Sequence, residues 1–298
     1  MALATAGCAT TTNPQPPRLG TEAPPGQDLK LAAYNVAFGA LVGGVGAVVN
    51  GEDGPPLQRF AEGAGWGAAG GTVAYAGKWA AGEIATRERL AYGLPARLVH
   101  DVGVSVVENA AHGRPPLDRL AAHVGFVRLD VRPGTGAVQA RLLPLNTVAF
   151  GLMLAENDLA VGRSLVYGTP LFTDEGRGRS PIFDITANGF AVLGSIYVNR
   201  DDDDFHDTAA HELVHALQSH EFVRAEAALL WSPLDEAFQE SDTYRALSRW
   251  IYLDVPALFA AAYFVVEGGD IDAPCKYDNW LEREAEAFGS RRAVGVCP

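Results

Sequence analysis

One short segment, His211-Glu212-Leu213-Val214-His215, constrains this chain more than any other. On an α-helix, side chains four residues apart project from the same face, so the imidazoles of His211 and His215 can bind one metal ion. Glu212 lies next to that face and can reach a water molecule on the metal instead of the metal itself. The flanking residues are mostly apolar or small, which is typical of a buried helix. The pattern therefore predicts a zinc site whose glutamate deprotonates an attacking water in a hydrolysis.

The residues before this segment support the same interpretation. Residues 189–199 are rich in β-branched and aromatic side chains and predict a strand, which a polar loop connects to the helix. The edge of such a strand can hold an extended peptide by main-chain hydrogen bonds, as a peptidase requires. The alternative is that His211 and His215 are two surface histidines on an ordinary amphipathic helix.

The net charge of the chain limits the classes of partner that it can bind. Its 298 residues carry a formal net charge of −13, which argues against nucleic acid and against docking on anionic lipid by charge. The length is sufficient for one large or two modest domains with a sizeable core. We therefore expect a peptide or protein substrate and no nucleic-acid partner.

Two of the three cysteines bear on the cellular compartment. Cys275 and Cys297 flank residues 280–292, and a disulfide between them would clamp this segment. A pair of buried free thiols is the alternative. A disulfide requires an oxidising compartment, which would lie outside the cytoplasm.

The amino terminus points to the same compartment. Residues 3–8, Leu-Ala-Thr-Ala-Gly-Cys, resemble the end of a bacterial lipoprotein signal, in which small residues precede a cysteine that becomes lipidated. The resemblance implies lipidation of Cys8, a Pro-rich tether over residues 10–26, and a protein of the cell envelope or a secreted one. Thr5 stands where the pattern usually has Leu, and no basic and apolar regions precede it. The alternative for residues 1–26 is a disordered leader.

Residues 27–123 are rich in Gly and Ala and predict a helical region. A turn-forming segment separates two apolar runs, 29–50 and 60–84. Glycines recur at intervals of four in the second run, at Gly63, Gly67 and Gly71. This spacing lets two helix backbones approach closely, so we expect a close-packed helical hairpin in a soluble domain. A membrane-embedded hairpin over 29–84 is the alternative, because the first run is near the length that spans a bilayer.

Beyond residue 124 the pattern changes to strands. Residues 127–132 and 138–142 alternate apolar and polar side chains around a Pro-Gly turn, which is typical of a β-hairpin. Further β-like runs are 147–154, 164–173 and 190–199. These runs predict a mainly antiparallel sheet over residues 124–199, followed by helices over 207–292. The predicted fold class is α+β.

A catalytic zinc site needs three protein ligands and one open position. The class with a third histidine six residues beyond the second requires Gly and His where this chain has Gln218 and Glu221, so that class is excluded. Downstream, Glu282 and Glu286 lie four residues apart on one face of a predicted helix. Glu284 is the competing candidate, because a small change in the register of that helix would put it in the place of Glu282. Weaker competitors are Glu236, Glu240 and Asp254.

The His-Glu-x-x-His motif and the later Glu-x-x-x-Glu pattern together resemble the gluzincin class of zinc metallopeptidases. The resemblance implies that Glu282 is the third zinc ligand and that Glu286 accepts a hydrogen bond from a ligand imidazole. It also implies a zincin-like catalytic region over residues 124–298. The class more often has Asp where this chain has Glu286. The resemblance covers roughly residues 190–292, and within this range only the motif residues are specific to the class.

The mechanism that follows is peptide-bond hydrolysis with zinc as cofactor and Glu212 as general base. A second oxyanion donor is expected, and the candidates are Tyr244, Tyr277, His220 and Arg283. Two alternatives stay open. One is a non-catalytic metal-binding envelope protein that acts through its Gly-rich hairpin, and the other is a zinc hydrolase of a non-peptide substrate.

Overall fold

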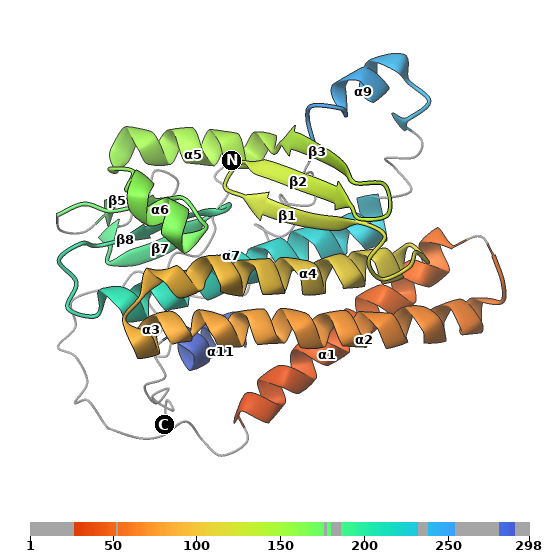
Figure 1. Ribbon diagram of the computed structural model, residues 1–298, viewed down its shortest axis with the longest axis horizontal. Coiled ribbons are helices and arrows are strands. Elements are labelled where there is room, and N and C mark those ends of the chain that lie inside the picture. The colour runs from red at the N-terminus through yellow and green to blue at the C-terminus, as the bar shows by residue number, and fades with distance from the viewer. Residues whose placement is uncertain are drawn as a thin grey trace.

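The computed structural model describes residues 27–51, 53–175, 178–179, 186–231, 238–253 and 280–289. Within these ranges the chain combines long helices with small β-sheets, so the predicted α+β class is confirmed. Figure 1 shows the long helices in the lower part of the view and most of the strands above them. The predicted leader over 1–26, with Cys8, lies outside the described residues, and so do Cys275 and Cys297.

The amino-terminal half contains the predicted helical hairpin. Its helices are α1 (Gln27–Asn50), α2 (Pro56–Ala81), α3 (Glu83–Arg87), the 3-10 helix η1 (Leu90–Tyr92) and α4 (Gly93–Ala111). A Cβ atom at Gly67 in α2 would lie 2.1 Å from the carbonyl oxygen of Gly39 in α1. One at Gly63 would lie 2.4 Å from the carbonyl oxygen of Gly43, so the two helices run antiparallel. Because no side chain fits at these contacts, the glycine spacing sets the distance between the helices.

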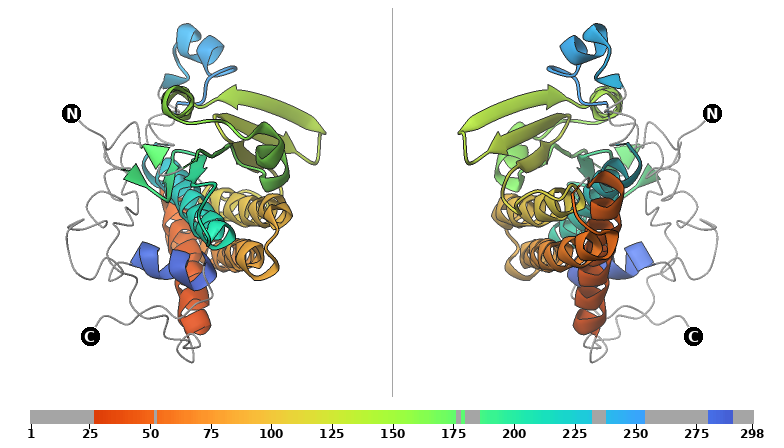
Figure 2. Two further views of the ribbon diagram at one scale, coloured as in Figure 1. Left: turned by 90° about the vertical axis from the view of Figure 1, so that its left-hand side faces the viewer. Right: turned by 90° about the vertical axis from the view of Figure 1, so that its right-hand side faces the viewer.

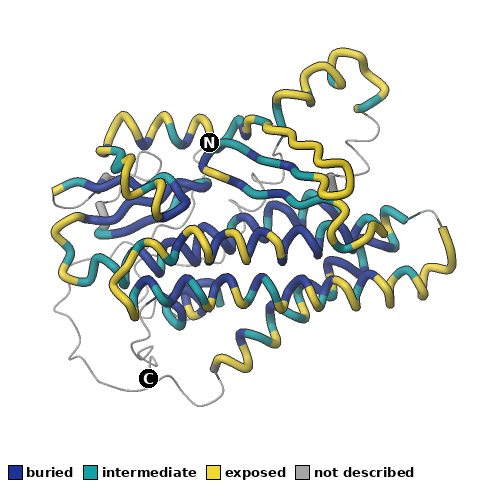
Figure 3. Tube along the Cα trace, in the orientation of Figure 1, coloured by how far each residue is buried: buried dark blue, intermediate teal, exposed yellow. Residues whose placement is uncertain are grey.

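Helix α4 covers another face of α2. A Cβ atom at Gly103 in α4 would lie 2.3 Å from the backbone nitrogen of Ala74 in α2, so this contact also depends on a glycine. Figure 2 shows α4 between α2 and the three-stranded sheet. Figure 3 shows that α2 and α4 each carry a buried face. Helix α2 is therefore packed by backbone contacts against both of its neighbours.

Helix α1 is long and apolar enough, by length and composition, to cross a membrane. In this structure Leu31, Val42 and Ala47 of α1 are buried. This arrangement fits the predicted close-packed hairpin. The membrane-embedded hairpin stays an alternative prediction.

The strands form three small sheets. The first has the order β1-β2-β3 and is antiparallel, with β1 (Leu120–Val124), β2 (Val127–Arg132) and β3 (Ala137–Leu142). The second has the order β4-β8-β7, with β4 (Leu171–Phe172), β7 (Gly189–Val192) and β8 (Ser195–Val198). The third pairs β5 (Gly178–Arg179) with β6 (Thr186–Ala187). The predicted β2–β3 hairpin is confirmed, whereas β4 pairs parallel with β8, so the second sheet is mixed.

Three of the predicted strands differ from the structure. Residues 189–199 form the antiparallel pair β7 and β8 instead of a single strand. Residues 147–154 belong to helix α5 (Pro144–Glu156), and residues 164–173 begin in helix α6 (Val161–Tyr167) before reaching β4. Pro144 occupies the first turn of α5, where it is tolerated because its missing N–H has no helical partner. Helix α5 buries a single stripe of side chains, Asn146, Ala149 and Met153. A short apolar run cannot by itself be distinguished from such a helix.

The remaining helices come from the carboxyl-terminal half. They are α7 (Phe205–Glu226), its π-helical continuation η2 (Ala227–Trp231), α9 (Asp242–Leu247) and α11 (Trp280–Gly289). The main core contains Leu31 and Ile84 from the first half together with Leu213 from α7 and Phe288 from α11. The Gly-rich helices and the motif helix therefore share one hydrophobic core.

The glycine contacts between α1 and α2 lead to a stability prediction. We expect Gly67→Ala to destabilise the protein by about 1–3 kcal/mol, because its methyl group would collide with the α1 backbone. Gly65→Ala is the matched control, since a Cβ atom there would meet nothing within 4 Å. The control should stabilise the helix by roughly 0.5–1 kcal/mol. Urea unfolding measures both changes, and equal stability of the two variants would contradict the packing.

Candidate metal centre

Helix α7 carries the motif along its buried side. Its core residues Ala209, Leu213 and Leu217 hold one face against the main core. The neighbouring face directs His211 and His215 toward α11, with a distance of 3.0 Å between their Nε2 atoms. The predicted helical spacing of the two imidazoles is therefore confirmed.

Helix α11 lies antiparallel to α7 beside this face. At one end, the carbonyl oxygen of Leu281 accepts a hydrogen bond of 3.0 Å from Gln218 Nε2. At the other end, a Cβ atom at Gly289 would lie 2.6 Å from the Cα atom of His211, so glycine permits the close approach. These two contacts place Glu282 opposite the histidines. Its Oε2 atom lies 3.5 Å from His211 Nε2, and its Oε1 atom lies 3.5 Å from His215 Nε2.

The distances between these three side chains fit a zinc ion. Zinc–nitrogen bonds of 2.0–2.1 Å at tetrahedral angles place neighbouring ligand atoms about 3.3 Å apart. The two imidazole nitrogens lie 3.0 Å apart. Each lies 3.5 Å from a different oxygen of Glu282, Oε2 for His211 and Oε1 for His215, so these separations are close to that value. His211, His215 and Glu282 are thus a group that could hold a metal ion, with all ligand atoms within 4.8 Å of one another. Two imidazoles and one carboxylate are also a donor set that zinc uses in catalytic sites.

Carboxylates dominate the electrostatics of this site. Burial lowers the pKa of His211, but its hydrogen bond with Glu282 and the charges of Glu212 and Glu286 outweigh burial and raise the pKa to about 9. Burial raises the pKa of Glu282, yet the two histidines hold it well below its usual range. The three carboxylates therefore favour positive charge at the imidazoles, and a divalent cation can supply that charge in place of protons.

Glu212 belongs to the motif helix α7, and its side chain faces strand β7. Its side chain is buried, and a Cβ atom at Gly189 in β7 would lie 3.0 Å from Glu212 Oε1. Burial raises the pKa of Glu212, while His211 and His215 lower it by a smaller amount. A buried carboxylate with a raised pKa beside the candidate metal site is suited to accept a proton.

The structure places Glu286 and Glu284 on different sides of α11, one near His211 and the other near Lys78. Glu286 Oε1 lies 3.8 Å from His211 Nδ1, on the side of the ring away from the ligand atom, where the resemblance implied a supporting partner. This distance is within ion-pair reach but too long for a hydrogen bond. Glu284 is buried on another face of α11 and bonds to Lys78, so it is not part of the ligand group. Of the weaker competitors, Glu240 is exposed, and Glu236 and Asp254 lie outside the described residues.

Lys78 on α2 forms a buried ionic network behind the site. Its ammonium group is 2.6 Å from Glu221 Oε2 and 2.9 Å from Glu284 Oε2. Asn35 on α1 completes the network, because it accepts a hydrogen bond from Lys78 and donates one of 2.6 Å to Glu284 Oε1. Burial lowers the pKa of Lys78, but the two carboxylates outweigh burial and raise it above its ordinary value.

Gln218 connects this network to a candidate ligand. Its amide nitrogen donates to Glu284 Oε2 at 2.8 Å, so its amide oxygen faces His215. That oxygen lies 2.9 Å from His215 Nδ1 and can only accept, which puts the ring proton on Nδ1 and leaves Nε2 free for a metal. Sequence reasoning missed this role for Gln218, Glu284 and Lys78. The available signal was a polar residue at a buried position of an apolar helix, since buried charges are usually paired.

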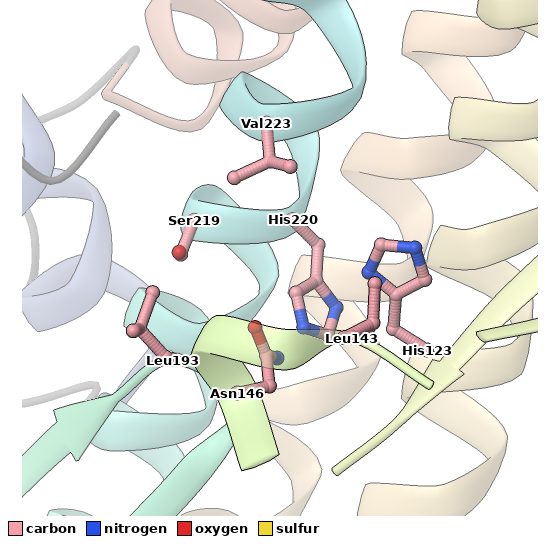
Figure 4. A pocket seen from close by; sticks show the side chains of 7 residues that line it. All are labelled: His123, Leu143, Asn146, Leu193, Ser219, His220 and Val223. Carbon is pink, nitrogen blue, oxygen red and sulfur yellow. The ribbon is translucent and has the colours of Figure 1, made fainter. Parts of the chain in front are cut away.

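Of the expected oxyanion donors, those that the structure describes do not gather at the site. Figure 4 shows His220 beside His123 at a small pocket on another side of α7. The cavity measures about 10 Å³, which is room for roughly one water molecule. Tyr244 lines a different cavity, Arg283 is exposed on α11, and Tyr277 lies outside the described residues.

Metal analysis of two variants tests the ligand assignment. We expect the wild type to bind one zinc ion per chain, and Glu282→Ala to lose more affinity than the 10–100-fold typical of a supporting residue, because a ligand is removed. Glu284→Gln is the control, since it removes the competing carboxylate but keeps hydrogen-bonding groups. Zinc content after dialysis against a chelator measures both. Zinc lost from Glu284→Gln and retained by Glu282→Ala would contradict the assignment.

Removal of the buried ammonium group of Lys78 should lower the stability of the folded protein. We expect Lys78→Met to lower the free energy of unfolding by about 3–5 kcal/mol, because it leaves Glu221 and Glu284 buried without their cation. Lys30→Met on the exposed surface of α1 is the control and should change stability by less than about 0.5 kcal/mol. Denaturant unfolding compares the two, and a stable Lys78→Met protein would show that the network is not needed.

Comparisons with known proteins add no family to this description. No protein-family model, no curated protein and no solved structure matches the chain. The case for a metal centre therefore stands on the arrangement of His211, His215 and Glu282 itself.

Proposed function

We propose that the protein is a zinc-dependent hydrolase that cleaves peptide bonds. The observation that carries this proposal is the cluster of His211, His215 and Glu282, with the buried carboxylate of Glu212 next to it. A structural zinc site is usually closed by four protein ligands, whereas a catalytic site has three and an open position. The described residues supply three ligands, which supports a catalytic site.

Each side chain has a separate task in this mechanism. When bound, zinc supplies a Lewis acid that polarises a carbonyl group and lowers the pKa of a water molecule. Glu212 accepts the proton of the attacking water and later donates it to the leaving amine. Gln218 holds the His215 ring with Nε2 directed at Glu282 and His211. Burial of Glu212 keeps its pKa raised, so that it both accepts and returns the proton readily.

Strand β7 supports a peptide as the substrate. It stands at one end of the β4-β8-β7 sheet, and its Gly189 backbone lies against Glu212. An extended peptide can add to such an edge by main-chain hydrogen bonds, which would bring its carbonyl groups past the catalytic carboxylate. A location outside the cytoplasm, with lipidation of Cys8, is part of the same proposal and rests on the amino-terminal sequence.

Glu212→Gln tests the reaction directly. We expect it to retain one zinc ion per chain but to lose peptidase activity by roughly 10²–10⁴-fold, because the amide cannot accept the proton. Glu62→Gln on the exposed face of α2 is the control and should retain full activity. Cleavage of a mixed peptide library, followed by mass spectrometry, measures both variants. Full activity of Glu212→Gln, or no cleavage by zinc-loaded wild type, would overturn the proposal.

A further inference from the structure

A second and larger cavity lies at the far end of α7 from the metal centre. It measures about 140 Å³ and is lined by the end of α4, strand β3, η2 and α9. Ala227 on its wall follows His215 by 12 residues of continuous helix. At 1.5 Å per residue, the two positions are about 18 Å apart along the axis. The cavity is therefore separate from the candidate metal site.

Three arginine side chains line this cavity, together with Glu108 and His112. Arg114, Arg119 and Arg141 line it, and Arg128 and Arg224 lie directly behind them. Glu108 and Asp130 form ion pairs with four of these five guanidinium groups, those of Arg119, Arg128, Arg141 and Arg224. Farther out, the opposite charges of Asp118 and Arg132 offset each other near Arg114. Positive charge is thus concentrated at one place in a chain whose net charge is −13.

The ion pairs hold two of these arginines in fixed positions. Asp130 accepts hydrogen bonds from Arg119 at 2.8 Å and from Arg141 at 2.6 Å. Arg128 and Arg141 stand directly opposite each other on β2 and β3, although like charges in that position repel. The ring of Tyr252 lies 4.5 Å from the Arg128 guanidinium and 4.7 Å from that of Arg141, which offsets part of the repulsion. The site is therefore arranged before any ligand binds.

Hydrogen-bond donors remain unused in this arrangement. The Nε atom of Arg141 is buried, and within the described ranges it has no hydrogen-bond partner. Buried donors are nearly always bonded, so Arg141 holds an unused donor beside the cavity. Arg114 adds an exposed guanidinium to the cavity wall, and Gln239 adds a neutral amide.

We propose that this cavity binds a small oxyanion with one or two carboxylate or phosphate groups. The planar fork of a guanidinium group can donate two parallel hydrogen bonds to two oxygens of a carboxylate or of a phosphate. The volume of about 140 Å³ suits a small ligand and falls below the 300–1,000 Å³ typical of drug-sized molecules. This site does not depend on the proposed hydrolysis.

Isothermal titration of the full chain with inorganic phosphate, and separately with succinate, tests the site and identifies the anion. We expect one saturable site for at least one of them. Arg114→Ala should weaken that binding by about tenfold or more, because it removes a charge-assisted contact. Arg114 is exposed, so its loss should leave the fold intact. Arg89→Ala removes the same charge from an exposed position elsewhere and should leave the affinity unchanged.

Arg141→Lys gives a second measurement, since it keeps the charge but removes the planar fork, and it should also weaken binding. Absence of saturable binding of either anion up to tens of millimolar would overturn the proposal. Binding that survives Arg114→Ala at full strength would lie elsewhere, the candidate zinc site included, and would overturn it as well.

Discussion

The buried ammonium group of Lys78 joins the two halves of this protein. A single charge in a protein interior is strongly unfavourable unless it is paired and hydrogen-bonded. Here Glu221 on α7 and Glu284 on α11 satisfy it, with Asn35 on α1 as a third partner. Four helices must therefore take up one relative position for the charges to be compensated. The close glycine packing of α1 against α2 brings Asn35 and Lys78 together at that point.

The geometry of the candidate metal centre follows from this constraint. Glu282 faces the two histidines only when α11 lies correctly against α7. Glu284, on another face of α11, is fixed by Lys78, while Gln218 on α7 bonds to both Glu284 and the backbone of Leu281. The same Gln218 orients His215. The Gly-rich region, which the sequence did not connect with the candidate metal ligands, thus positions the groups behind them.

Local features could be predicted from the sequence, and long-range ones could not. The spacing of His211 and His215 fixes their common helix face, and alternation fixes the β2–β3 hairpin, because both depend on neighbouring residues. Glu282 was placed by its resemblance to a known ligand pattern. Helix α5 was mistaken for a strand because its apolar run is short. The partners of Lys78 are 143 and 206 residues away, and no local pattern identifies them.

The position of Glu282 near the carboxyl end has a consequence for the time at which the centre is assembled. During synthesis, the two histidines and Glu212 emerge well before α11, and only the docking of α11 adds the third ligand. Contacts of such long sequence separation form slowly, after much of the chain has been ordered. A newly made chain therefore carries an incomplete centre until folding is nearly finished. Under the proposed function, the chain would not expose a working site while its own backbone is still unfolded.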